Sequence, residues 1–209
     1  TAAADTDITY TNGGTAATSI DTLNVVTTGG ASNIGNLAFG GTTLNISGDQ
    51  NLTIDDDLSG VINLIDASSF TGALSLDVAD DTSTPDATAS SVDVVDITIK
   101  GGSGNDNIDV SSAGTDNEIL VESGTGNDTI IVGAVLTNAS STTAGDVIKG
   151  GAGTDTLTGD VDLFDTAAIA STAALTGVSG IETLDLSGTM GGGDAVTLSR
   201  ISSEIDRVN

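Results

Sequence analysis

The sequence predicts an all-β protein and, within that class, a right-handed parallel β-solenoid of the β-helix or β-roll kind. Three observations predict it: short apolar segments recur along the chain, Gly, Asn, Asp and Ser separate them, and the apolar residues are mostly aliphatic. Of 209 residues, 28 are Gly, three are Phe, one is Tyr and none is Trp. Small, often β-branched side chains suit stacked strands, and a core with so few large rings does not suit irregular packing.

The repeating unit is visible first near the N-terminus. Thr22-Leu23-Asn24-Val25 recurs as Thr43-Leu44-Asn45-Ile46, 21 positions later (43 − 22), and Ile62-Asn63-Leu64 repeats it more loosely. Units of about 18 to 27 residues are too small to bury an apolar face alone, so they gain a common core by stacking. Further short strands are expected at residues 74–78, 95–99, 119–121, 129–132 and 183–186, where apolar and polar residues alternate.

Two segments interrupt this pattern. Residues 79–91 contain the only proline, Pro85, and are predicted to form a polar loop. Residues 160–176 are rich in Ala and predict either a loop or one short helix capped by Asp165.

Neither interruption is long enough to form a domain, so we expect one continuous solenoid. A soft boundary is expected near residue 92, because the Gly-rich motifs described below begin after it. Residues 1–91 would then hold the repeats without these motifs, and residues 92–209 the repeats with them. The chain begins at Thr1 without an initiator Met or a basic leader, so we expect it to be a segment or processed product of a longer protein.

The charge of the chain restricts its partners. Thirty Asp and Glu stand against four Lys and Arg, which gives a formal net charge of −26. Such a surface repels nucleic acid and anionic membranes. No segment approaches the roughly 20 apolar residues that span a bilayer. We therefore expect no nucleic-acid partner and no membrane insertion, and we expect divalent cations as counterions.

The absence of His and Cys restricts the chemistry. The available bases and nucleophiles are carboxylates, hydroxyls, Tyr10, Lys100 and Lys149. Each lysine directly precedes a Gly-Gly pair, which favours charge compensation over catalysis. We therefore expect that the protein is not an enzyme.

Three nine-residue segments give the strongest local signal. Residues 101–109 and 150–158 match every fixed position of the motif G-G-x-G-x-D-x-U-x, where U is a large apolar residue. Residues 123–131 match it with Ser in the first Gly position. The segments start 22 and 27 residues apart (123 − 101 and 150 − 123), about one repeat each, which predicts that they stack along one edge.

This motif suits calcium. Glycines allow a tight turn that turns carbonyl oxygens inward, and the Asp adds a charged oxygen. Calcium takes six to eight oxygen ligands, so one turn supplies part of the shell and a stacked turn completes it. Three turns predict at least two ions; the alternative is that the segments are merely turns. The candidate ligand positions are Gly101, Gly102, Gly104, Asp106, Ser123, Gly124, Gly126, Asp128, Gly150, Gly151, Gly153 and Asp155.

On these nonapeptides the chain resembles the RTX-type calcium-binding surface proteins. Its sequence segments at residues 42–49, 64–74 and 180–188 are similar to segments of bacterial surface-layer (S-layer) proteins. The resemblance implies a secreted, calcium-dependent building block, exported by a type I system and held on a Gram-negative cell surface by lipopolysaccharide contacts elsewhere in the protein. The chain departs from the family in having one motif per repeat instead of tandem copies, and no type I secretion tail is recognisable after Ser199.

Other acidic segments are weaker candidates. Five residues fall on positions 1, 3, 5, 6 and 12 of an EF-hand loop, namely Asp55, Asp57, Ser59, Gly60 and Asp66. The flanking residues alternate like strands and not like helices, which leaves an irregular calcium site or a solvated acidic turn as the alternatives. Asp80 and Asp81 are expected in a solvated loop. Residues 124–128 also resemble a repeat of ice-binding adhesins, but a single copy forms no ladder of Thr and Asn.

These observations together predict a structural component of an extracellular, calcium-stabilised surface layer that associates with copies of itself in a lattice. The alternative is a calcium-dependent RTX adhesin module that binds a surface ligand or glycan. A β-helical enzyme acting on polysaccharide is a third possibility, but it would need cations beside its carboxylates, and the chain has four basic residues.

Overall fold

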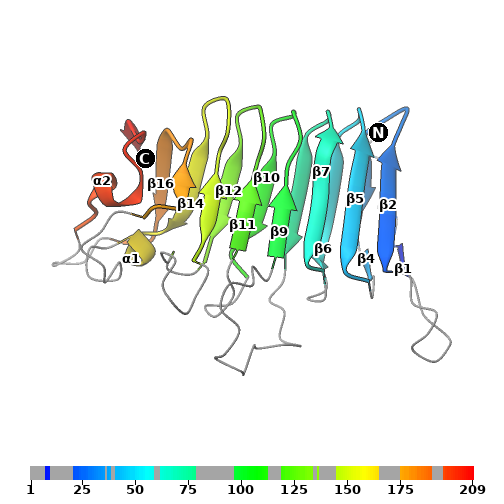
Figure 1. Ribbon diagram of the computed structural model, residues 1–209, viewed down its shortest axis with the longest axis horizontal. Helices are drawn as coiled ribbons and strands as arrows, with labels where there is room; N and C mark the ends of the chain where they lie inside the picture. The colour runs from blue at the N-terminus through cyan, green and yellow to red at the C-terminus, as the bar shows by residue number, and fades with distance from the viewer. Residues whose placement is uncertain are drawn as a thin grey trace, which may run out of the picture.

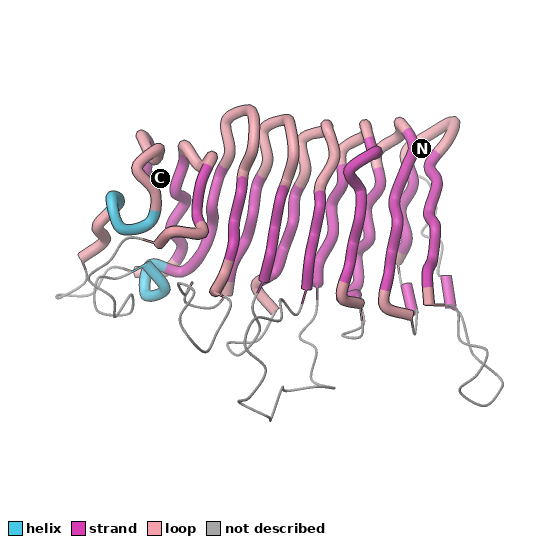
Figure 2. Tube along the Cα trace, viewed as in Figure 1, coloured by secondary structure: helices cyan, strands magenta, loops and turns pink. Residues whose placement is uncertain are grey.

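The structure is a computed structural model, and it describes residues 8–9, 21–35, 37–38, 41–58, 62–78, 97–112, 119–133, 136, 145–164, 175–189 and 195–209. Within these ranges the chain forms two parallel β-sheets that lie face to face, together with a small two-stranded sheet (Figures 1 and 2). The prediction of an all-β fold built from parallel strands is therefore confirmed.

One large sheet has seven strands, and its neighbour has eight. The seven-stranded sheet contains β2 (Thr22–Thr27), β5 (Thr43–Gly48), β7 (Leu64–Phe70), β9 (Ile97–Lys100), β11 (Ile119–Glu122), β13 (Val147–Lys149) and β15 (Val178–Ser179). The eight-stranded sheet contains β3 (Ser32–Ile34), β6 (Leu52–Leu58), β8 (Leu74–Val78), β10 (Asn107–Val110), β12 (Thr129–Val132), β14 (Thr156–Asp160), β16 (Thr183–Ser187) and β17 (Arg207–Val208). The small sheet pairs β1 (Ile8–Thr9) with β4 (Leu37–Ala38).

The chain visits the two large sheets in turn. From β5 to β14, each strand of the seven-stranded sheet is followed by one of the eight-stranded sheet. We call the segment that gives one strand to each sheet a repeat. Parallel neighbours need a crossover connection, and here the strand in the opposite sheet is part of that connection. Each strand thus pairs with its counterpart one repeat away.

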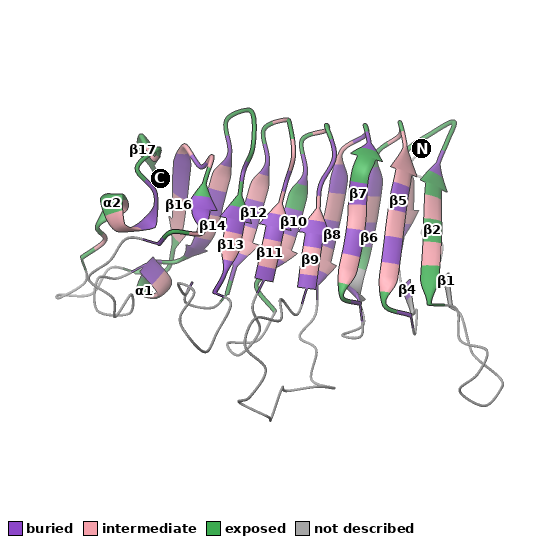
Figure 3. Cartoon of the chain, in the orientation of Figure 1, coloured by how far each residue is buried: buried purple, intermediate pink, exposed green. Residues whose placement is uncertain are grey.

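The core lies between the two sheets. Side chains alternate along each strand between a buried inner row and a more exposed outer row (Figure 3). The inner row of the seven-stranded sheet is Leu23, Leu44, Ile65, Ile99, Val121, Ile148 and Val178. The inner row of the eight-stranded sheet is Ile34, Ile54, Leu76, Ile108, Ile130, Leu157 and Leu184. These rows explain why the core needs aliphatic residues of similar size in every repeat.

The strand register corrects one detail of the sequence repeat. Asn45 pairs with Asp66, not with Asn63, so the third copy of the early pattern begins at Leu64. The spacing from Thr43 to Leu64 is again 21 residues (64 − 43). Ile62 and Asn63 therefore precede the strand. The sequence pattern misplaced them because the residue type at a single outward position does not determine the register.

The first expected interruption lies between β8 and β9. The pairs β7 with β9 and β8 with β10 join the sheets across residues 79–96. The expected polar loop at residues 79–91 and the expected boundary near residue 92 lie outside the described residues. Both sheets therefore continue from the strands before residue 79 to the strands after residue 96.

Two single-turn helices, α1 (Val161–Phe164) and α2 (Leu198–Ile201), belong to the C-terminal part (Figure 2). The residue that caps α1 is Asp160, whose Oδ1 accepts a hydrogen bond from the Asp162 N–H at 3.0 Å. The loop or short helix expected at residues 160–176 is described only as far as Phe164 and from residue 175, and the cap expected at Asp165 lies outside the described residues. Within the described ranges, neither helix nor any other has the length and apolar character required to cross a membrane.

Two adjacent isoleucines on β12 test the inner and outer rows. Ile130 is 0% exposed and belongs to the inner row, whereas Ile131 lies on the outer face of the same strand. We expect Ile130→Ala to lower the free energy of unfolding by about 2–5 kcal/mol, because it leaves a cavity between the sheets. The matched Ile131→Ala change should cost less than about 1 kcal/mol. Chemical denaturation measures both, and equal losses would contradict the assignment of the two rows.

Candidate metal centre

The three motif segments form neighbouring turns at one edge of the sheets. They connect β9 to β10, β11 to β12 and β13 to β14, and they appear as short loops along the upper edge of Figure 2. Each motif turn spans six residues between its strands, at residues 101–106, 123–128 and 150–155. The turns on either side, residues 71–73 and 180–182, span three. The motif turns therefore form a distinct block, stacked as their spacing predicts.

The motif aspartates join successive repeats through the backbone. The Asp106 N–H donates to Asp128 Oδ1 at 2.8 Å, and the Asp128 N–H donates to Asp155 Oδ1 at 2.8 Å. At the two ends of this ladder, the Leu74 N–H donates to Asp106 Oδ1 at 2.9 Å and the Asp155 N–H donates to Glu182 Oε2 at 2.8 Å. Each carboxylate thus accepts a hydrogen bond from the preceding repeat.

Asparagines form a second ladder beside the first. The Asn127 N–H donates to Asn105 Oδ1 at 2.8 Å, and the Thr154 N–H donates to Asn127 Oδ1 at 2.9 Å. Here each side chain accepts a hydrogen bond from the following repeat, the reverse of the aspartate ladder. The two ladders therefore link the motif turns in both directions along the stack.

The motif glycines allow the turns to approach each other closely. A Cβ added at Gly124 would overlap the carbonyl oxygen of Gly102, and one added at Gly151 would overlap that of Gly124. Both glycines also have positive φ, +107° and +96°. Gly102 itself is not among the glycines with positive φ, so in the first motif close approach and not φ requires glycine.

The remaining motif glycines lie in equally close contact. A Cβ at Gly104, Gly126 or Gly153 would overlap a carbonyl oxygen of the preceding repeat. A Cβ at Gly101 or Gly150 would overlap a carbonyl oxygen of the following repeat and come 2.7 Å from Oδ2 of the aspartate in its own motif. The first glycine therefore faces a space bordered by oxygen atoms.

Ser123 takes the place of that first glycine in the middle motif. Its side chain is fully buried, and its hydroxyl donates to the Gly150 carbonyl oxygen at 2.6 Å. The hydroxyl thereby bonds to an oxygen of the following repeat, at the position where Gly101 and Gly150 have no side chain.

Among the motif aspartates, two buried carboxylate oxygens have no hydrogen-bond partner. Asp106 uses both oxygens, since its Oδ2 accepts a hydrogen bond from the Gly102 N–H at 2.9 Å. In contrast, Oδ2 of Asp128 and Oδ2 of Asp155 are buried without a hydrogen bond, and these residues are 1% and 0% exposed. A buried, unsatisfied oxygen is costly, and more so when it carries charge. These two atoms therefore require either a proton or a cation.

The pKa values of all three aspartates reflect this burial. Burial raises the pKa of Asp106 against the hydrogen bonds from the Gly102 and Leu74 N–H groups. It also raises the pKa of Asp128, against the Asp106 N–H and the nearby Ser123 hydroxyl, and the negative charge of Asp106 adds to that rise. The pKa of Asp155 is raised to about 6, chiefly by burial. The hydrogen bond from the Asp128 N–H opposes that rise, and the negative charges of Asp128 and Glu182 add to it.

The donors at each turn are mainly carbonyl oxygens. In the described parts of the chain, no three carboxylates are arranged so that they could hold one metal ion, so carbonyl oxygens would have to supply most ligands of each ion. Three expected carbonyl ligands are already engaged: Gly102 O accepts from the Thr125 N–H at 3.0 Å, Gly124 O from the Ala152 N–H at 3.1 Å and Gly150 O from the Ser123 hydroxyl at 2.6 Å. Each keeps one lone pair. The donor set is compatible with calcium, with Asp128 and Asp155 as the charged ligands.

Sequence reasoning missed Glu182. It lies outside the nonapeptides, yet its carboxylate completes the aspartate ladder in the repeat after the last motif. The signal that could have found it is spacing, since Glu182 follows Asp155 by the same 27 residues that separate Asp155 from Asp128 (182 − 155 and 155 − 128). An acidic residue therefore ends the ladder.

The EF-hand interpretation is excluded, because Asp55 lies in β6 and Asp66 in β7, where an EF-hand requires helices. Oδ2 of Asp55 accepts a hydrogen bond from Asn33 Nδ2 at 2.8 Å, and Asp66 Oδ1 accepts from the Ser68 hydroxyl at 2.6 Å. The candidate positions at residues 59–60 and the acidic pair at residues 80–81 lie outside the described ranges.

The chain matches no family of known proteins, no curated protein and no solved structure. The candidate centre therefore rests on its own geometry. That geometry consists of three stacked six-residue turns, a ladder of buried carboxylates and two carboxylate oxygens without partners.

The raised pKa of Asp155 predicts how stability depends on pH without divalent cations. The folded state binds this proton more readily than the unfolded chain, whose Asp has the ordinary value of 3.8. The stabilisation is therefore complete below that value and is lost as pH rises through about 6. In EDTA, we expect the free energy of unfolding to fall between about pH 4 and pH 7, most steeply between the two pKa values. Chemical denaturation across this range measures the slope.

Two variants isolate the contribution of this carboxyl group. Asp155→Asn keeps an oxygen for the Asp128 N–H and removes the titrating group, so its stability should change less with pH than that of the wild type. Asp185→Asn makes the same chemical change on the half-exposed outer face of β16 and should keep the wild-type slope. A slope that is identical in the wild type and Asp155→Asn would contradict the assignment.

Proposed function

We propose that the chain is a calcium-stabilised, right-handed parallel β-solenoid that serves as a structural component of an extracellular bacterial surface layer. In this proposal it associates with copies of itself in a lattice, and it is not an enzyme. The single observation that carries the proposal is the pair of buried Oδ2 atoms of Asp128 and Asp155, which lack hydrogen-bond partners in a chain of net charge −26.

The strand order supports the solenoid. A chain that alternates between two facing parallel sheets, and always pairs with the strand one repeat away, follows the path of a coil. Parallel crossover connections are right-handed in nearly all proteins, which favours the right-handed form. In such a coil each repeat contacts its neighbours alone, so the contacts between successive turns determine stability.

Calcium would act at the contact between successive turns. Asp128 and Asp155 would supply the charged oxygens, and main-chain carbonyls of the motif turns would supply the others. A bound divalent cation would neutralise carboxylates that are buried about 5 Å apart, the spacing of neighbouring strands. Asp106 is the weakest of the three candidate ligands, because both its oxygens already accept hydrogen bonds.

The surface, the composition and the charge of the chain support a structural role. Its described surface is two extended sheet faces, and the chain has no His or Cys for ordinary acid–base or nucleophilic catalysis. The strong negative charge disfavours nucleic acid and membrane partners. The resemblance to RTX and S-layer proteins supports an extracellular location after type I secretion, with lipopolysaccharide contacts made by other parts of the protein.

Calcium should raise the melting temperature of the wild type, and EDTA should reverse the rise and dissolve the assemblies. At a calcium concentration a hundredfold above Kd, the gain in stability would be about 2.7 kcal/mol. Asp155→Asn should invert this behaviour. At neutral pH it should be more stable than the wild type in EDTA, because a buried charge is removed, and less stable in calcium, because a ligand is lost. Thermal melts by circular dichroism measure both effects.

A matched variant controls for the change in net charge. Asp109→Asn removes one negative charge from the outer face of β10, away from the turns, and should respond to calcium as the wild type does. Light scattering on the same samples reports assembly size. If calcium changes neither the melting temperature nor the assembly size of the wild type, the proposed function is wrong.

A further inference from the structure

The outer face of the seven-stranded sheet carries two regular rows of side chains. The first is uncharged, with three Thr and three aliphatic residues, and we call it the apolar row: Thr22, Thr43, Leu64, Thr98, Leu120 and Val147. The second we call the charged row: Asn24, Asn45, Asp66, Lys100, Glu122 and Lys149. All twelve side chains are half-buried or exposed, and the sheet lies toward the viewer in Figures 1 and 3.

The charges in this row alternate in sign from strand to strand. Asp66 pairs in register with Lys100, Lys100 with Glu122, and Glu122 with Lys149. Lys149 Nζ lies 2.7 Å from Glu122 Oε1. The row therefore has no net charge, although the whole chain carries −26.

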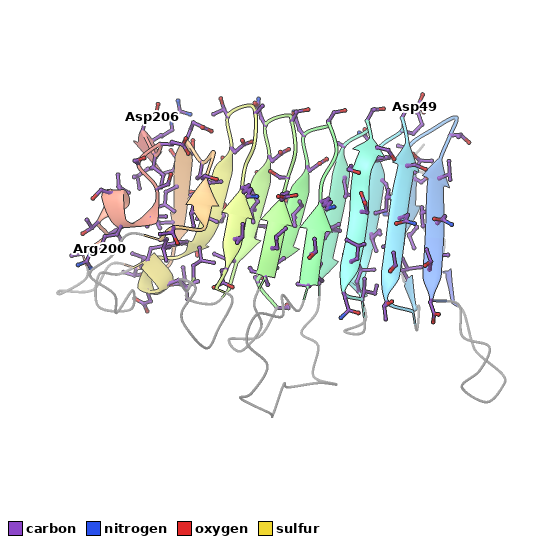
Figure 4. All side chains as sticks on the ribbon, in the orientation of Figure 1. Asp49, Arg200 and Asp206 are labelled. Carbon is purple, nitrogen blue, oxygen red and sulfur yellow. The ribbon has the colours of Figure 1, made fainter. Side chains whose placement is uncertain are left out.

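Half of the basic residues of the chain lie in this row. The other two are Arg200 and Arg207, in α2 and β17 of the C-terminal segment, and Figure 4 labels the first of them. The outer face of the eight-stranded sheet is acidic by contrast. Asp55, Asp109 and Asp185 lie on it, and its described strands from β3 to β16 contain no Lys or Arg. Among the described outer faces, the neutral one is where a copy of this chain meets the least repulsion.

We propose that two copies of the chain pack with their seven-stranded sheets face to face and their long axes antiparallel. The twofold axis lies parallel to the strands, between β9 and β11. This proposal deepens the self-association in the proposed function, on which it rests, by naming the surface that makes the contact. It does not depend on the calcium turns.

The symmetry makes each row face itself in reverse order. Lys100 then lies opposite the partner's Glu122, and Asp66 opposite the partner's Lys149, so all four charges meet opposite charges. In the apolar row, Leu64 faces the partner's Val147 and Thr98 faces the partner's Leu120. The row is thus complementary to itself, as a twofold interface requires.

The alternating charges also fix the register. Moving the axis onto β9 or β11 would place Lys100 or Glu122 against its own copy in the partner. Moving it by a full strand spacing, to lie between β7 and β9, keeps the contact between Asp66 and the partner's Lys100 but leaves the other charges opposite uncharged residues. The axis between β9 and β11 gives the largest number of favourable contacts.

The area of this face suits a weak contact that is repeated many times. With the twofold axis between β9 and β11, six strands of each copy overlap, from β5 to β15. Spaced about 4.8 Å apart, with about four residues each, they give a face of about 29 by 14 Å, or about 400 Å² per copy. The two copies together would bury about 800 Å², which is in the range of weak contacts. A lattice gains its strength from many such contacts.

Two single charge reversals and their mixture test the proposal. Lys100→Glu alone places like negative charges opposite each other in the dimer, and Glu122→Lys alone places like positive charges opposite each other. Each variant alone should associate at least about tenfold more weakly than the wild type. An equimolar mixture should restore association, because every charge of one variant then faces an opposite charge of the other. Sedimentation velocity over a range of concentrations, in calcium, measures all three samples.

Two further variants complete the design. The double variant with Lys100→Glu and Glu122→Lys keeps both the net charge and the antiparallel complementarity, and should associate like the wild type. Asp109→Lys, on the outer face of the eight-stranded sheet, should leave this dimer unchanged. Restoration by mixing cannot come from misfolded chains, so it supports the interface even if one single variant is less stable.

The outcomes separate this inference from the proposed function. If the wild type associates and each single reversal associates equally well, the named face is wrong, while the proposed self-association stands. Association that is lost in both single variants and is not restored by mixing also overturns the face. If the wild type stays monomeric at every concentration in calcium, the self-association itself is wrong, and the face with it.

Discussion

The stacking of the motif turns depends on buried aspartates that bond to the backbone of a neighbouring repeat. Asp128 holds the N–H of Asp106, and Asp155 holds the N–H of Asp128, each at 2.8 Å. At Asp128 and Asp155 the carboxylate used in this way is buried, and its second oxygen is buried with it. The geometry that joins the repeats therefore also creates the need for a proton or a cation at Asp128 and Asp155. The support between repeats and the need for a proton or a cation therefore have the same origin in this molecule.

Much of this arrangement could be predicted because the sequence repeats. The spacing of the nonapeptides predicted that their aspartates stack, and the alternation of apolar residues predicted strands such as β5 and β12. The third copy of the early repeat was placed at Ile62 instead of Leu64 because Asn and Asp are interchangeable at an outward position. Asp66 occupies that position, so the residue type did not determine the register. Both lysines were expected to compensate charge beside the motif turns. They are the last strand residues before two of these turns and lie on the outer sheet face, where Lys149 pairs with Glu122.

The contacts between repeats could not be read from the motif. A nonapeptide specifies which residues turn the chain, but it does not specify which backbone group a carboxylate will bond to. Glu182 acts like a motif aspartate although its turn has three residues and not six, because a longer side chain spans the shorter turn. Ser123 is a substitution within the motif, and its hydroxyl makes a hydrogen bond where the other motifs have glycine. Both depend on the neighbouring repeat.

The opposite directions of the aspartate and asparagine ladders have a mechanical consequence. Asp128 reaches back to the preceding repeat, while Asn105 reaches forward to the following one. Sliding the repeats past one another would strain both sets of hydrogen bonds at once. Separating one repeat from the stack would break bonds in both ladders together with the strand pairing. The edge that carries the motif turns is therefore built to bear tension, and a fracture would begin where the ladders are absent.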